Sequence, residues 1–152
     1  YFYHININDM IHIEKIKQTI AYSISMVLAT LFLFAATTKL LNYREFSLQL
    51  AQPSILRGYT DIVAWMVPVA ELVVSVLLFF KSFRLQALFA SFGLIVLFTT
   101  YILLILNFSD VVPCSCVGVI PALGWTDHIL FNIALLALAA LGIFYSKNMA
   151  SE

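Results

Sequence analysis

Charged residues are scarce in this chain of 152 residues. Eight lysines and arginines balance eight aspartates and glutamates, and together they make up 11% of the chain, whereas 62% is hydrophobic. Soluble domains have about 25% charged and about 45–50% apolar residues. The composition therefore excludes an ordinary soluble domain and indicates a membrane protein. Because the formal net charge is zero, nothing in the sequence suggests a nucleic-acid partner.

Cysteine is also rare, since the chain has only Cys114 and Cys116, separated by one residue. Two thiolates supply half of a tetrahedral metal site, and no further ligands are evident nearby, so no metal centre is expected. A structural disulfide between them would add little to the stability of the fold, because closing so short a loop removes little entropy from the unfolded chain. Strained or exposed disulfides are the labile or catalytic ones. The spacing therefore favours redox chemistry, with an inert or structural pair as the alternative.

Four apolar runs are long enough to cross a bilayer as helices, which takes about 20 residues. They predict an all-α fold, a four-transmembrane-helix bundle within residues 20–145 that carries a Cys-x-Cys loop between helices 3 and 4. Small residues such as Ala87, Ser91 and Gly93 suit close packing of membrane helices. The expected spans are residues 20–40, 61–80, 85–106 and 125–145.

The basic residues predict the orientation of the bundle, because lysine and arginine gather on the cytoplasmic side of membrane proteins. The tails and the middle loop contain Lys15, Lys17, Lys81, Arg84 and Lys147. The cysteine loop contains no lysine or arginine. We therefore expect a multi-pass protein of the bacterial inner membrane with cytoplasmic tails, residues 1–19 and 146–152. The cysteine loop would then lie in the periplasm, where disulfides persist.

The connector between the first two spans has an amphipathic pattern. Tyr43, Phe46 and Leu50 recur at helical spacing, and Pro53 follows them. This spacing predicts a short helix that ends before the proline. The helix would either lie in the membrane interface or pack its apolar face under the loop.

Glu71 lies about ten residues inside the second span, where an ionisable group is costly and usually faces a partner or a pathway. Lys39, near the outer end of the first span, is the basic candidate if its side chain reaches inward. Alternatively, a protonated Glu71 would donate to the carbonyl of Ala64, which Pro68 leaves free because proline has no backbone N–H. The sequence leaves open whether Glu71 joins helices or forms a proton or ligand site with Lys39.

The fourth span begins at the level of the cysteines. Positive partial charge at its N-terminus would stabilise a thiolate if the loop folds back on it. His128 is placed to donate to that thiolate or to shuttle a proton. The alternative is that His128 only sits among the lipid headgroups, while Trp125 is an interfacial anchor.

These features together resemble the DoxX/MauE group of bacterial membrane proteins, particularly its MauE branch. The resemblance rests on the span pattern, on Lys39, Pro68 and Glu71, on the run Cys-Ser-Cys-Val-Gly at residues 114–118, and on Trp-Thr-Asp-His at 125–128. Valine stands at position 117, where an aromatic residue is common in that branch. The resemblance implies that the protein acts together with a thioredoxin-like partner in disulfide formation or in the maturation of periplasmic proteins. It also implies a link to quinone-coupled electron transfer in the DoxX-type members.

The sequence thus predicts a membrane thiol/disulfide redox protein. It would pass electrons between a periplasmic thioredoxin-like or substrate protein and a membrane acceptor, with Cys114, Cys116 and His128 as the catalytic residues. A quinone in the bundle is suggested by analogy with other four-helix thiol oxidases. The alternative is a non-catalytic integral subunit or assembly factor of a larger membrane complex, in which the cysteines form a conformational clip. The sequence leaves open whether the protein is an enzyme.

Overall fold

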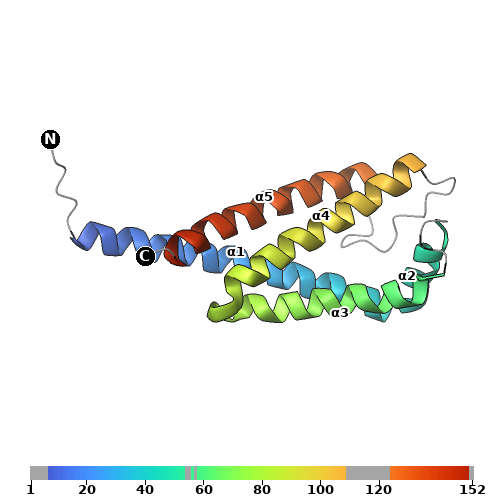
Figure 1. Cartoon of the computed structure of the whole chain (residues 1–152), viewed down its shortest axis with the longest axis horizontal. Helices are drawn as coiled ribbons and strands as arrows, with labels where there is room; N and C mark the ends of the chain where they lie inside the picture. The colour runs from blue at the N-terminus through green and yellow to red at the C-terminus, as the bar shows by residue number, and fades with distance from the viewer. Residues whose placement is uncertain (1–6, 54–55, 57, 109–123, 151–152) are drawn as a thin grey trace.

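A computed structural model describes residues 7–53, 56, 58–108 and 124–150. In these residues the chain is helical and contains no strand. The elements are α1 (Ile7–Leu41), α2 (Tyr43–Ala51), α3 (Thr60–Phe79), the short 3-10 helix η2 (Lys81–Phe83), α4 (Arg84–Phe108) and α5 (Trp125–Ala150) (Figure 1). Four of them, α1, α3, α4 and α5, are long and apolar enough to cross a membrane. The predicted all-α fold with four spanning helices is confirmed, whereas the cysteine loop lies outside the described residues.

The first helix is longer than the first apolar run. It begins at Ile7 and so includes much of the polar segment that precedes residue 20. From Ile7 to Leu41 there is no proline or glycine to interrupt the helix. An ion pair one turn apart, Lys17 Nζ to Glu14 Oε1 at 3.3 Å, lies on this polar stretch. The predicted first span, residues 20–40, is therefore only part of α1, and the helix begins well before it.

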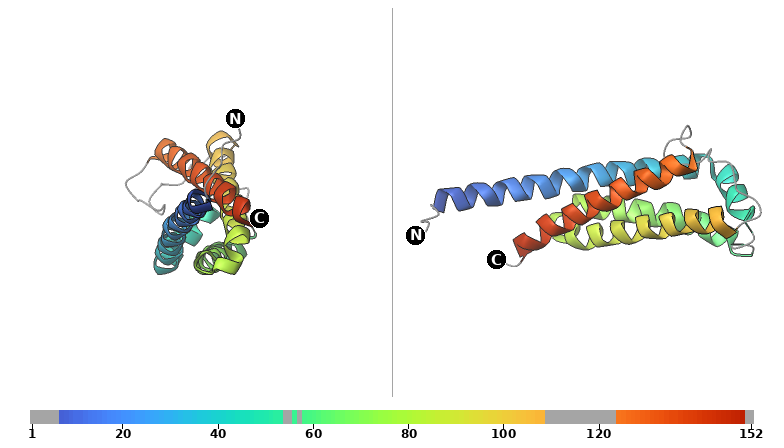
Figure 2. Two further views of the ribbon diagram at one scale, coloured as in Figure 1. Left: turned by 90° about the vertical axis from the view of Figure 1, so that its left-hand side faces the viewer. Right: turned by 90° about the horizontal axis from the view of Figure 1, so that it is seen from above.

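The four long helices run up and down, so both termini lie at one end of the molecule and α2 lies at the other (Figures 1 and 2). The tight η2 turn holds α3 and α4 together at the end near the termini. From there α4 rises away from α3 and runs beside α5 (Figure 1). The bundle is therefore closed at the η2 end and more widely spaced toward α2.

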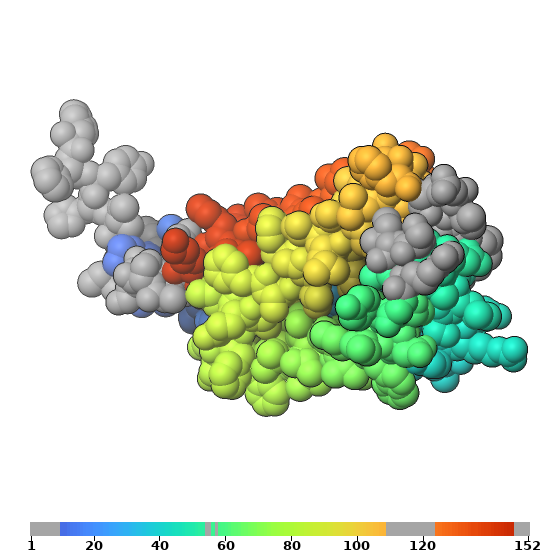
Figure 3. All heavy atoms as spheres, turned by 45° about the vertical axis from the view of Figure 1, so that its right-hand side comes forward, coloured from blue at the N-terminus to red at the C-terminus, as the bar shows by residue number. Residues whose placement is uncertain are grey.

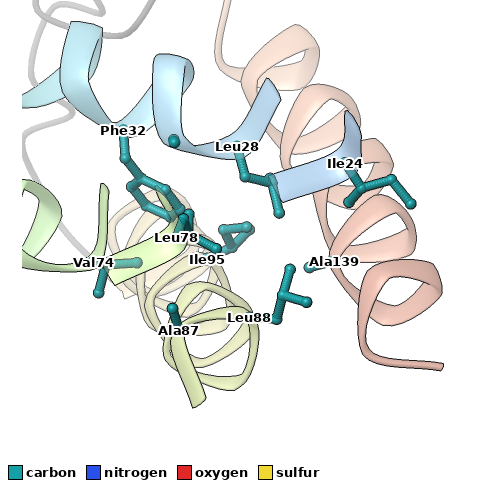
Figure 4. Packing of buried hydrophobic residues seen from close by; sticks show 10 residues of the cluster. Ile24, Leu28, Phe32, Val74, Leu78, Ala87, Leu88, Ile95 and Ala139 are labelled. Carbon is teal, nitrogen blue, oxygen red and sulfur yellow. The ribbon is translucent and has the colours of Figure 1, made fainter. Parts of the chain in front are cut away.

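The main hydrophobic core fills the closed part of the bundle (Figure 4). All four long helices contribute buried side chains: Ile24, Leu28 and Phe32 from α1, Val74 and Leu78 from α3, Ala87, Leu88 and Ile95 from α4, and Ala139 from α5. The hydroxyl of Ser75 on α3 donates to the carbonyl oxygen of Ala29 on α1 at 2.8 Å. Such contacts between small residues let membrane helices approach closely.

Two glycines of the spans differ in their surroundings. A Cβ placed on Gly142 of α5 would lie 2.9 Å from Ile24 Cγ2 and 3.0 Å from Leu88 Cδ2, so this glycine permits the approach of α1 and α4. A Cβ on Gly93 would meet no described atom within 4 Å. The expectation that Gly93 suits close packing is therefore wrong, although Ala87 and Ser91 of the same helix are fully buried.

Helix α2 packs across the end of the bundle. Phe46 and Leu50 form a second buried cluster with Ala64 of α3. Tyr43 lies against Trp65, with 5.3 Å between ring centroids. The predicted short helix is present, it ends two residues before Pro53, and its apolar face packs against α3.

Candidate functional site

A buried ion pair joins α1 and α3. The Lys39 ammonium lies 2.6 Å from Glu71 Oε1, and the side chains are 14% and 1% exposed. At 1.5 Å per residue, Glu71 is about 16 Å along α3 from Thr60. Lys39 reaches it because Cα–Cβ bonds tilt toward the N-terminus of a helix, which for Lys39 is the direction of the bundle interior. Of the two partners expected for Glu71, the structure contains Lys39 and not the carbonyl of Ala64.

Two aromatic rings complete the surroundings of the ammonium group. Lys39 Nζ lies 5.9 Å from the ring centroid of Phe46 on α2 and 5.6 Å from that of Phe98 on α4. Both distances fall within the range of cation–π attraction. The ammonium group is therefore held by side chains from three helices besides its own.

Two polar atoms beside the ion pair lack a partner among the described residues. Glu71 Oε2 and the Tyr101 hydroxyl oxygen are buried and make no hydrogen bond there. Leaving such a group unsatisfied costs roughly 1–3 kcal/mol, and more for a charged one. The site therefore has unused capacity to bind a polar group.

These polar atoms face a cavity of about 380 Å³ between the four helices. Lys39, Glu71, Tyr101 and His128 line it, and most of the remaining wall is leucine, isoleucine, valine and phenylalanine. Small-molecule sites are typically concave, mostly apolar and about 300–1,000 Å³, with a few convergent polar groups. This cavity has those properties.

His128 is one of the cavity residues and is only 8% exposed. It lies in the first turn of α5, where its backbone N–H donates to the carbonyl of Gly124 at 3.0 Å. Trp125, one turn earlier, also lines the cavity, and the two ring centroids are 6.4 Å apart. The His128 side chain is therefore largely buried and borders the interior of the bundle.

The structure brings three of the five predicted site residues together, namely Lys39, Glu71 and His128. Cys114 and Cys116 lie outside the described residues. Among the described residues, no group of three His, Cys, Asp or Glu side chains is arranged to hold a metal ion.

Tyr101 is the cavity residue that sequence reasoning missed. A tyrosine inside an apolar run is a usable signal, because a buried phenol hydroxyl usually requires a hydrogen-bond partner. Asn132, an amide within the fourth apolar run, also lines the cavity.

Four apolar helices around a buried charged pair define a multi-pass membrane protein with a polar site inside the bundle. The family model described as methylamine utilisation protein MauE matches residues 17–145, so the chain belongs to the MauE family. Comparisons with curated proteins and with solved structures give no match. Membership of this family fits a redox or accessory role in a membrane.

Proposed function

We propose that the protein is a membrane thiol/disulfide redox protein that uses Cys114 and Cys116. The observation that carries this proposal is the cavity, largely apolar but lined by Lys39, Glu71 and His128, toward the end of the bundle where α4 ends and α5 begins. An electron carrier between a water-soluble partner and the membrane needs a thiol pair beside a site inside the bundle. Membership of the MauE family supports the same role.

The partner is a periplasmic thioredoxin-like or substrate protein. Its thiolate attacks one sulfur of the Cys114–Cys116 disulfide and displaces the other as a thiolate, which gives a mixed disulfide. The second partner thiol then attacks the mixed bond. The partner leaves as a disulfide, and Cys114 and Cys116 remain as a dithiol, so two electrons and two hydrogens have moved.

Re-forming the disulfide needs an acceptor for two electrons and two protons. A membrane quinone supplies this chemistry, because its reduction to a hydroquinone takes up both. His128 lines the cavity and follows the cysteine-bearing segment, residues 109–123, by five residues. We expect it to carry a proton between the thiols and the cavity, because histidine changes its protonation state near neutral pH.

Substituting one cysteine tests the exchange step. With Cys116→Ser or Cys114→Ser the resolving thiol is missing, so a mixed disulfide with the partner should accumulate and run as a larger band on a non-reducing gel. The band should disappear on reduction and in the double Cys114→Ser, Cys116→Ser variant. Full function of that double variant in the cell, with no trapped partner from either single variant, would show that the protein is a structural subunit instead.

A further inference from the structure

We propose that the cavity binds a lipid-soluble quinone, with its ring beside the Lys39–Glu71 pair and its tail in a groove along α4. This inference rests on the proposed redox function for its biological meaning. Its structural support comes only from described residues of the bundle.

The free hydrogen-bonding groups match both redox forms of such a ligand. The Lys39 ammonium has three donors, of which one is used by Glu71, and the Tyr101 hydroxyl has no partner among the described residues. Both residues line the cavity, and both groups can donate to a carbonyl oxygen. Glu71 Oε2 is an acceptor without a described partner, which suits the hydroxyl of a hydroquinone.

The same groups disfavour other membrane molecules. A fatty acid would bring a second carboxylate next to Glu71, and like charges at close range repel. A phospholipid ester has carbonyl acceptors but no hydroxyl donor for Glu71 Oε2. A quinone is neutral, and its two carbonyl oxygens can accept hydrogen bonds from Lys39 and Tyr101. After reduction, a hydroxyl of the hydroquinone can donate to Glu71 Oε2.

The cavity wall includes residues of α3 and α4 that extend to the outer surface of the bundle. Its wall includes Val67 of α3 together with Leu97 and Phe98 of α4, and Leu97 is 58% exposed. Both helices are visible on one face of the molecule, with α2 at one end of that face (Figure 3). A ligand is therefore able to enter from the bilayer.

A shallow second hollow of about 350 Å³ continues from this opening along α4. It shares Leu97 and Tyr101 with the cavity and extends to Gly93. The missing side chain of Gly93 keeps this hollow open, since a Cβ there would meet no described atom within 4 Å. The hollow gives an apolar tail a continuous path from the cavity to the lipid.

Binding can be measured without any redox turnover. The chain has two tryptophans, of which Trp125 lines the cavity and Trp65 packs on Tyr43 with its side chain largely exposed. In purified full-length protein with Trp65→Phe, decylubiquinone should quench Trp125 fluorescence in a saturable way. Quenching that rises linearly with quinone and never saturates would show partition into the micelle and would overturn the proposal.

Tyr101→Phe is the sharpest variant, because it removes a hydroxyl that has no described partner and so should leave the fold intact. It should weaken binding about fivefold, and Lys39→Met with Glu71→Gln should weaken it about tenfold or more.

Gly93→Leu tests the path of the tail. It should weaken the binding of decylubiquinone more than the binding of a quinone that has the same ring and no tail. Val76→Leu, on an exposed face of α3 outside both hollows, is the matched control. Equal affinity in Tyr101→Phe and Val76→Leu would contradict the assignment.

Two further measurements distinguish a quinone site from a fatty-acid site, and the cavity proposal from the thiol-exchange proposal. If palmitate changes Trp125 fluorescence saturably and decylubiquinone does not quench it saturably, the site takes a lipid carboxylate and the quinone proposal is wrong. Decylubiquinone should bind the Cys114→Ser, Cys116→Ser protein with unchanged affinity. Saturable binding there, combined with failure to trap a partner through either single cysteine variant, would support the cavity assignment while refuting the thiol exchange.

Discussion

The Lys39–Glu71 pair is costly to place inside a bilayer. Taking two charges out of water is expensive, and replacing a buried ion pair by packed hydrophobic residues is often neutral or stabilising. Stability alone therefore does not account for this pair. Ionisable residues inside membranes usually mark substrate, ion or proton sites. Here the pair borders a cavity where Glu71 Oε2 and the Tyr101 hydroxyl make no hydrogen bond to any described residue.

The pair should be detectable as an energetic coupling. Glu71→Gln leaves Lys39 without its counter-charge, and removing one partner of a buried pair costs about 3–5 kcal/mol. Lys39→Met should partly rescue that variant, because it removes the uncompensated charge. Unfolding of the four proteins of the double-mutant cycle in detergent measures the coupling, and a value near zero would mean that the two side chains are not paired.

At the level of single residues, the sequence showed which ionisable groups are costly to bury in a membrane, but it did not show how those groups are arranged. Glu71 and Lys39 were visible as charges in or near apolar runs, yet their pairing depended on how far Lys39 reaches inward. Tyr101 was missed because α4 is apolar on all sides, so its sequence does not show which face points into the bundle.

At the level of elements, the closed end of the bundle depends on close approach at Gly142. A leucine there would place its side chain where Ile24 and Leu88 now lie, at 2.9 and 3.0 Å from the added Cβ. Overpacking of this kind costs typically about 1–3 kcal/mol, so Gly142→Leu should lower the melting temperature in detergent.

Gly93→Leu is the matched control, since the same change on α4 meets no described atom within 4 Å of the added Cβ. It should leave the melting temperature unchanged or slightly higher, because glycine is a poor helix former. Equal destabilisation by both leucines would argue against the different packing of the two glycines.

The elements themselves were largely predictable from the apolar runs, because a bilayer fixes the length and helical form of its spans. The start of α3 and the end of α2 fell within two residues of the sequence expectation. The start of α1 did not, because a helix without proline or glycine continues past the point where hydrophobicity ends.

At the level of the whole molecule, the chain is an up-and-down bundle with both termini at one end (Figure 1). The cavity, with its few polar side chains, lies toward the other end. The basic residues support the proposal that the terminal end faces the cytoplasm. The cavity and the cysteine-bearing segment would then face the periplasm. The splayed arrangement of α3 and α4 could not be predicted from the sequence, because it depends on packing between helices and not on the composition of either one.

The measurement that tests this account most directly is thiol accessibility in intact spheroplasts. A membrane-impermeant maleimide should leave Cys114 and Cys116 unlabelled before reduction, and should label them from outside after an impermeant reductant is added. When the reductant is washed away, the thiols should become unreactive again as the disulfide re-forms. A cysteine at position 147, made by Lys147→Cys in the Cys114→Ser, Cys116→Ser background, should react only after the membrane is opened. Full labelling without any reductant, or labelling of Cys114 and Cys116 only in opened cells, would contradict a periplasmic redox disulfide.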